Sequence, residues 1–302
     1  MSRILVVDDE PAIRQILSEF LGAAGYQVGV ACDGVEGLQR ALADDWDLVL
    51  SDISMPRCNG IEFLSELARL RPNVHRVLLT AHTIEEFIGE FLDHDLSCVL
   101  TKSVPFPLAE ILDTVESLLS RRIFGIERHV HPGTAVTRHS VRSHTDIVQV
   151  SDVVSGLTEG RRRIHLCTIL NEILTNAVYY GVRNEQGDRK ETWSRDFVLS
   201  EPEAVLLETA HDSEKLAITI TDPGGRLDRK TVLHWLHRQL VRDDTGLPKG
   251  IFDNHGRGFF ISRSFSDRLS ISIEKGKRCE VTLVLWDGAP PLGEKPLMIL
   301  EI

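Results

Sequence analysis

Five short apolar runs, each followed by an amphipathic segment, alternate through the first 120 residues and restrict the fold more than any other feature of this sequence. They read "ILVV", "VGVA", "LVLS", "VLLT" and "CVLT". Short β-rich runs that alternate with helical patterns predict βα units, in which helices cover both faces of a parallel sheet. We therefore expect an α/β fold, with a doubly wound (βα)5 parallel sheet in this part of the chain.

Polar residues follow the predicted strands at the end of the sheet where ligands bind. In open parallel sheets, that place is the edge beyond the carboxyl ends of the strands. The residues expected at this edge are Asp8, Asp9, Asp52, Thr80 and Lys102. Strand-end aspartates that only form turns are the alternative for each residue alone, and the complete set of five argues against it.

The five residues suit the transfer of a phosphoryl group. Carboxylates gathered at one edge repel one another and need a cation, and their oxygen atoms suit Mg²⁺. Asp52 is then a candidate nucleophile. The metal and Lys102 would neutralise the phosphoryl charge, and the hydroxyl of Thr80 would bond to a phosphate oxygen.

Residues 1–121 resemble the response-regulator receiver family. The matching motifs are "VVDDE", "LVLSDISMPRCNGIEFL", "LLTAH" and "LTKSVPFP". The resemblance implies that Asp9 and Asp52 bind the metal directly, that Asp8 holds a metal-bound water, and that the carbonyl of Ser54 is a further ligand. It also implies a cognate histidine kinase as phosphodonor.

Two positions depart from the receiver pattern. The family usually has proline directly after the lysine in a cis peptide, whereas Ser103 follows Lys102 here and Pro105 comes later. The aromatic residue usual three positions before the lysine is Val99. We therefore expect the signal to leave this domain by a route other than the usual pairing of a threonine with an aromatic residue.

A predicted helix over residues 164–180 has an apolar stripe with a polar pair at its margin. Glu172 and Asn176 lie four residues apart, on the same side of the helix, whereas Asn171 falls on the opposite, solvated face. A half-buried pair of this kind could grip a metal or polarise a water molecule. A polar fringe on an amphipathic helix is the alternative.

Two further segments suggest a nucleotide site. In "KLAITITDPGG" the alternation places Asp222 on the inward side at a strand end, where a buried carboxylate needs a donor such as the amino group of adenine. Gly224 and Gly225 would let the ring approach the backbone. In "NHGRGFFISRSF", Gly256 and Gly258 precede a predicted helix, whose free N–H groups attract phosphate.

Residues 134–287 resemble the Bergerat-fold ATP-binding family, in the branch of anti-sigma-factor serine kinases. The motifs are "NEILTNAVYYG", "TDPGG", "NHGRGFFISRSFSD" and "EVTLVL". The resemblance implies an α/β two-layer sandwich with a mixed sheet. It implies that Asn176 binds Mg²⁺, that Glu172 acts as the base toward a substrate hydroxyl, and that Asp222 binds the adenine of ATP. The phosphates would bind at the turn formed by Gly256, Arg257 and Gly258.

The adenine motif departs from the family pattern. That pattern has glycine two and four residues after the aspartate, whereas Arg226 stands at the second of these positions and Gly225 directly before it. The polar insertion "RNEQGDRKETWSRDF" after the first motif is also longer than we expect.

Length and composition set the remaining bounds. We expect a receiver domain over 1–122, a linker over 123–133, an ATP-binding domain over 134–288 and a tail over 289–302. The net charge of −11 argues against a nucleic-acid partner, and five scattered cysteines without a CxxC pair argue against zinc and disulfides. Without a long apolar stretch, we expect no membrane span and a cytoplasmic protein.

The leading hypothesis is a response regulator whose output is an ATP-dependent serine/threonine protein kinase. The resemblance implies a sigma factor or an anti-sigma-antagonist-like protein as the partner. Two alternatives are a non-catalytic ATP-binding module that sequesters its partner, and an atypical histidine-kinase-like protein. A homodimer is left open.

Overall fold

The computed structural model describes residues 1–185, 193–242, 244, 257–288 and 295–302. Its residue contacts form two compact units. Of the described residues, 1–123 and 295–298 belong to the first unit, and 124–288 and 299–302 belong to the second.

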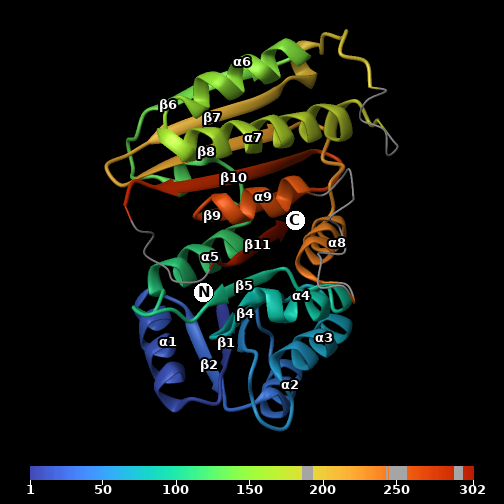
Figure 1. Cartoon of the computed structure of the whole chain (residues 1–302). Helices are drawn as coiled ribbons and strands as arrows, with labels where there is room; N and C mark the ends of the chain where they lie inside the picture. Colours follow the sequence, from blue (N-terminus) through green and yellow to red (C-terminus); the bar gives the residue numbers. More distant parts are fainter. Residues whose placement is uncertain (186–192, 243, 245–256, 289–294) are drawn as a thin grey trace. The chain divides into compact units, whose positions relative to one another are not determined.

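The first unit alternates strands and helices throughout (Figure 1). Its elements are β1 (Arg3–Val7), α1 (Pro11–Ala23), β2 (Gln27–Ala31), α2 (Gly34–Ala43), β3 (Leu48–Asp52), α3 (Gly60–Leu70), β4 (His75–Thr80), α4 (Ile84–Asp93), β5 (Cys98–Thr101) and α5 (Leu108–Ser120). The strands lie in the order β2-β1-β3-β4-β5, and each neighbouring pair is parallel. The predicted doubly wound parallel sheet is confirmed.

The central strands of this sheet are apolar because both of their faces are covered. Residues 4–7 of β1 and 48–50 of β3 are fully buried. Strands covered on both sides show continuous apolar runs instead of an alternating pattern. This burial fixes the carboxyl ends of β1 and β3, where the acidic residues stand.

Local signals begin the helices next to that edge. Pro11 occupies the first turn of α1, where its missing N–H costs no hydrogen bond. Asn59 caps α3 by accepting a hydrogen bond from the Glu62 N–H at 2.8 Å. Gly60, the first residue of α3, donates its N–H to the carbonyl of Ile53 at 2.9 Å, so the helix starts directly against the end of β3.

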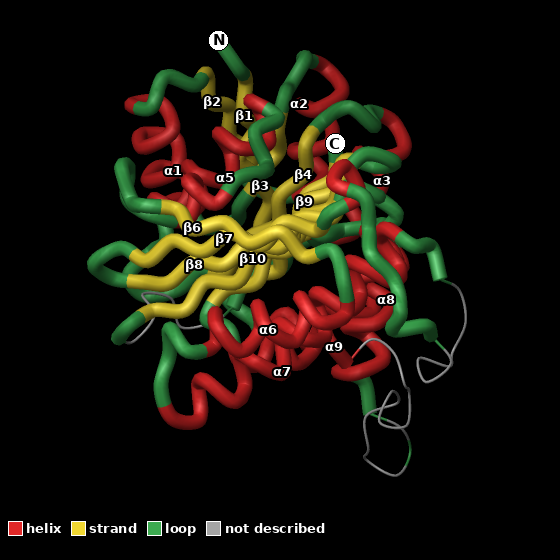
Figure 2. Tube along the Cα trace, turned by 90° about the horizontal axis from the view of Figure 1, so that it is seen from above, coloured by secondary structure: helices red, strands yellow, loops and turns green. Residues whose placement is uncertain are grey.

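The second unit contains a sheet with helices on one face (Figure 2). Its elements are η1 (Ile126–His129), β6 (Val136–Val141), α6 (His144–Ser155), α7 (Gly160–Asn176), η2 (Ala177–Val182), η4 (Glu201–Glu203), β7 (Val205–His211), β8 (Lys215–Asp222), α8 (Arg229–Leu240), α9 (Arg257–Phe265), β9 (Arg268–Glu274) and β10 (Arg278–Trp286). The strands lie in the order β9-β10-β8-β7-β6, with antiparallel neighbours. The last strand, β11 (Leu297–Glu301), begins by pairing with β5.

Helix α7 changes its winding where it reaches the predicted nucleotide site. From Ala177 to Val182 the backbone continues as the π-helical turn η2. Such turns are rare in helices and occur frequently at functional sites. At the same end of the sheet as Asp222, Gly276 has a φ of 73° and closes the hairpin between β9 and β10.

Residues 124–130 pack on the face of this sheet opposite the helices. The N–H of Gly125 donates to both carboxylate oxygens of Glu280, at 2.9 and 3.2 Å. The guanidinium of Arg278 lies 3.9 Å from the centre of the Phe124 ring. The segment that follows the first unit is therefore anchored to β10.

None of the helices within the described ranges combines the length and the apolar character needed to cross a bilayer.

Gly60 gives a direct test of how α3 meets β3. A Cβ atom added there would overlap the carbonyl oxygen of Asp52. We expect Gly60→Ala to lower the free energy of unfolding of the first unit by at least about 2 kcal/mol, because backbone must shift. Native-state hydrogen exchange of residues 1–123 in the full chain measures this.

The matched control is Gly22→Ala in α1, where an added Cβ meets nothing within 4 Å. It should stabilise the unit by about 0.5 to 1 kcal/mol, because alanine favours the helix. Equal effects of the two substitutions would contradict the packing described here.

Candidate functional site

Lys102 joins the acidic residues at the carboxyl edge of the first sheet. Its Nζ atom lies 2.8 Å from Oδ2 of Asp8 and 2.6 Å from Oδ1 of Asp52. Both carboxylates are buried, and Glu10 approaches the same ammonium at 3.5 Å from the exposed side. The structure thus brings together residues from the ends of β1, β3 and β5.

The pKa shifts follow from this burial. Desolvation raises the pKa of Asp8, and the bond to Lys102 only partly offsets it. Burial alone would lower the pKa of Lys102, but its bonds to Asp52 and Asp8 outweigh that effect and raise the pKa. The lysine therefore remains charged, as neutralisation of an aspartyl phosphate would require.

The remaining predicted residues stand beside this group. Asp52 pairs with Leu79 across the sheet, so Thr80 lies one residue beyond it on β4. The hydroxyl of Thr80 accepts a hydrogen bond from the His82 N–H at 2.9 Å, and its carbonyl accepts from the Lys102 N–H at 2.6 Å. Asp9 is exposed at the end of β1.

The donor atoms fit Mg²⁺ in kind, because Asp8 and Asp52 offer only oxygen ligands and both are buried. Throughout the described part of the chain, no three acidic, histidine or cysteine side chains are grouped as a metal ion requires. Lys102 lies between the two carboxylates, and Asp9 points into solvent. Metal binding would therefore require Asp9 to turn inward.

The structure shows the surroundings of the two positions that depart from the receiver pattern, Val99 and the loop after Lys102. Val99 is fully buried and pairs with Leu78 of β4 on one side and Leu297 of β11 on the other. The position therefore offers no exposed side chain that could move with Thr80. The cis peptide of this loop lies between Val104 and Pro105.

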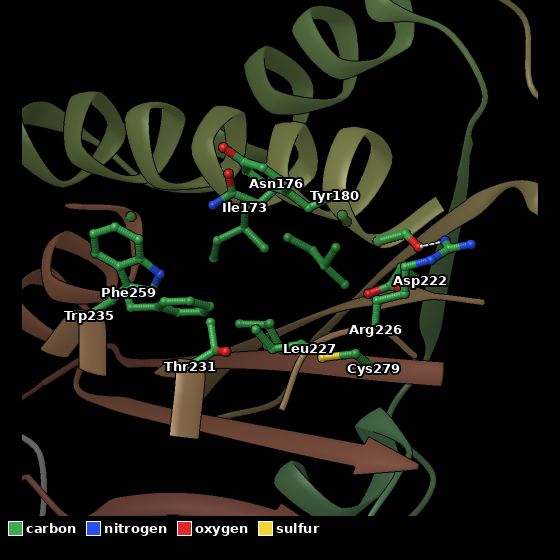
Figure 3. A pocket seen from close by; sticks show the side chains of 15 residues that line it. Ile173, Asn176, Tyr180, Asp222, Arg226, Leu227, Thr231, Trp235, Phe259 and Cys279 are labelled. Atoms are coloured by element: carbon green, nitrogen blue, oxygen red, sulfur yellow. Dashed lines mark hydrogen bonds between the residues drawn. The ribbon is translucent and has the colours of Figure 1, made fainter. Parts of the chain in front are cut away.

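A cavity of about 330 Å³ opens in the second unit between the helices and the sheet (Figure 3). This volume lies within the range of small-molecule sites. The lining residues come from α7, η2, β8, α8, α9 and β10 and include the loop after β8. They are Ile173, Asn176, Ala177, Tyr180, Gly181, Ile220, Asp222, Arg226, Leu227, Thr231, Trp235, Gly258, Phe259, Cys279 and Val281.

Asp222 is the buried acid of this cavity, with 6% of its surface exposed. Its Oδ1 atom accepts hydrogen bonds from the N–H groups of Gly224 at 3.0 Å and Gly225 at 3.1 Å. Burial raises its pKa to about 6, while these two N–H groups and the cation of Arg226 act in the opposite direction. Among the described residues, Oδ2 has no hydrogen-bonding partner.

Glu172 and Asn176 are both half-buried on α7, and α9 begins close to them. A Cβ atom on Gly258 would lie 3.3 Å from Nδ2 of Asn176 and 3.7 Å from Oε2 of Glu172. Asn176 lines the cavity, whereas Glu172 is not among the described residues that line it. Asn171 is also half-buried and donates to the carbonyl of Cys167 at 2.8 Å, so it is less exposed than the sequence predicted.

The predicted phosphate turn is described only in part. Gly256 lies outside the described residues, and for Arg257 only the backbone, at the start of α9, is described.

Sequence models of two families match the chain. The response regulator receiver domain matches residues 4–116, and the histidine kinase-like ATPase domain matches residues 136–285. Response regulator MprA from Mycobacterium bovis is 31% identical over 203 residues, which cover 66% of this chain and 82% of that protein. The chain belongs to the response regulator family. The predicted two-domain architecture is confirmed.

The chain is also similar to other proteins. Transcriptional regulatory protein RprY from Bacteroides fragilis is 28% identical over 174 residues, which cover 57% of this chain and 72% of that protein. Among solved structures, the chemotaxis protein CheY4 of Vibrio cholerae is 33% identical, covers 39% of this chain and 99% of its own, and has a TM-score of 0.37. Receiver domains accept phosphate from a histidine kinase, which suits this response regulator.

Some residues of this response regulator's cavity were not predicted as site residues from sequence. A Cβ atom on Gly181 would lie 2.7 Å from Cγ of Asp222, so this glycine lets η2 contact the acid. Cys279 is opposite Asp222 in the β8–β10 ladder. Trp235 and Phe259 supply aromatic walls. For these residues, the only indication in the sequence was Gly181 itself, the glycine that ends the motif "NEILTNAVYYG".

The raised pKa of Asp222 predicts an unusual dependence of stability on pH. Its folded pKa of about 6 lies above the ordinary 3.8, so the folded state holds the proton more tightly. The stability contributed by this group is present at low pH and is lost as the pH rises through about 6.

Asp222→Asn should remove this loss of stability with rising pH. It should make the nucleotide-free protein more stable at pH 7.5 by on the order of 1 to 3 kcal/mol. Thermal unfolding of wild type and of Asp222→Asn at pH 5 and 7.5 measures the change of stability with pH. Asp196→Asn, at an exposed position, is the control and should show the wild-type change of stability with pH. A wild-type dependence of stability on pH in Asp222→Asn would show that burial of this carboxylate does not raise its pKa.

Proposed function

We propose that this response regulator binds ATP in the cavity of its ATPase domain, and that phosphorylation of Asp52 controls how the domain acts on a partner protein. One observation carries the proposal. Asp222 is buried in a largely apolar cavity, with one oxygen held by the backbone and the other left for a ligand. A buried acceptor of this kind needs a donor.

Adenine supplies such a donor through its exocyclic amino group. The ring would lie between β8 and the helices, among apolar side chains such as Leu227 and Phe259. The amide oxygen of Asn176 is a suitable ligand for the Mg²⁺ that accompanies the phosphates, and the half-buried amide already faces the cavity. Gly258 would bring the N–H groups of α9 toward those phosphates.

The receiver domain supplies the control. Asp52 would accept the phosphoryl group from a cognate histidine kinase, Lys102 would neutralise it, and Thr80 would turn its hydroxyl from His82 to a phosphate oxygen. Asp8 and Asp9 would hold Mg²⁺. The modification adds about two negative charges. Coupling of about 1 to 3 kcal/mol would change the activity of the second domain about 5- to 150-fold.

The output reaction would be transfer to a serine or threonine of the partner. Glu172 would take the hydroxyl proton as the oxygen bonds to the γ-phosphorus, and ADP would leave with the electrons of the broken bond. The resemblance to anti-sigma-factor kinases points to a sigma-factor antagonist or its regulatory target as the partner.

A second function is favoured by the position of Glu172. This residue lies close to the start of α9 and is not among the described residues lining the cavity. A base that stays in this position would not reach a substrate hydroxyl at the nucleotide. The domain would then bind ATP without transferring phosphate and would capture or release its partner according to the state of Asp52.

Glu172→Gln separates the two functions. Proteins captured from the source cell, with and without beryllofluoride at Asp52, are incubated with labelled ATP. If the domain is a kinase, wild type labels a serine or threonine and Glu172→Gln lowers the rate by about 10²- to 10⁴-fold. The affinity for ATP should remain within about threefold, a change of under 1 kcal/mol.

Glu201→Gln, an exposed position, is the control and should label like wild type. If capture depends on ATP but no protein is labelled, the binding function is correct. Capture that depends on neither ATP nor beryllofluoride would contradict both functions.

A further inference from the structure

Arg226 joins two sides of the nucleotide cavity that are far apart in the sequence. Its Nη1 atom donates to the carbonyl of Val182 at 2.8 Å and also to the carbonyl of Gly181. These carbonyls belong to the end of η2, and the last carbonyls of a helix have no partner within it. A cation at this end also interacts favourably with the negative pole of the helix dipole.

The two backbones that Arg226 joins are already in contact. A Cβ atom on Gly224 would overlap the carbonyl oxygen of Gly181, and a Cβ on Gly181 would meet the carboxylate of Asp222. The loop after β8 and the end of η2 can approach this closely only because both positions are glycine. The contact places carbonyl and carboxylate oxygens together, so a cation is needed there.

The turn that brings Arg226 into place depends on the residue before it. Gly225 has a φ of 56° and packs against the backbone of Lys277 and Arg278. This is the left-handed conformation, which glycine adopts without cost. Gly225, the shifted glycine, therefore makes the turn that brings Arg226 to the carbonyls of η2. Arg226 stands where the family pattern has its second glycine.

We propose that Arg226 is a positioning residue that closes the adenine end of the cavity by tying the loop after β8 to the end of η2. This inference rests on the proposed binding of ATP. In this role the guanidinium acts through its hydrogen bonds to the carbonyls of Gly181 and Val182. It fixes the separation between Asp222 and the wall formed by η2, so that the cavity is formed before a nucleotide arrives, and preorganisation of this kind raises affinity.

The test compares Arg226→Met, Arg226→Lys and wild type in the full chain. One nitrogen carries both hydrogen bonds, so the lysine ammonium can replace it, whereas methionine cannot. Amide hydrogen exchange without nucleotide should be about tenfold faster in η2 and in residues 223–228 of Arg226→Met. The dissociation constant for Mg–ATP, from calorimetry, should rise about 10- to 100-fold.

Arg226→Lys should restore most of both effects. Lys230→Met removes the same charge four residues away, at an exposed position of α8, and should match wild type. Unchanged exchange in Arg226→Met, or equal ATP affinity in the presence of faster exchange, would overturn the role of Arg226. If wild type itself binds no adenine nucleotide, the proposed function fails and the positioning role fails with it.

Discussion

The second unit is organised around one buried carboxylate. Asp222 would be costly in this environment without the two N–H groups of Gly224 and Gly225, and even with them its pKa is raised. Holding it requires a strand that ends at this residue, a loop that turns back at once, and a helix end that approaches without a side chain. The wall of the cavity around Asp222 follows from these three requirements.

The first unit also holds buried carboxylates, but a cation stabilises them instead of backbone N–H groups. Asp8 and Asp52 are brought together by parallel strands, and their repulsion is offset by Lys102 from a third strand. The cation belongs to the fold and is present before any phosphoryl group arrives. In both units, the apolar strands place the charged groups and a nearby donor or cation keeps them there.

Much of the fold and part of the site could be predicted from sequence, because they depend on local patterns. Alternation places Asp222 inward, and the apolar runs place Asp8 and Asp52 at one edge. The contacts of Gly181 and Arg226 could not be predicted in this way, because they arise where segments more than 40 residues apart meet. Helical periodicity placed Glu172 beside Asn176, but it could not show that α9 would begin close to the glutamate.

Calorimetry on the full chain with Mg²⁺ and either ATP or GTP tests whether Asp222 binds adenine. Adenine presents an amino donor where guanine presents a carbonyl acceptor, so a buried carboxylate should discriminate between them. We expect saturable binding of ATP with one site per chain and an affinity at least about tenfold higher than that for GTP, equivalent to about 1.4 kcal/mol. Absence of heat with ATP, or equal affinity for the two nucleotides, would contradict it.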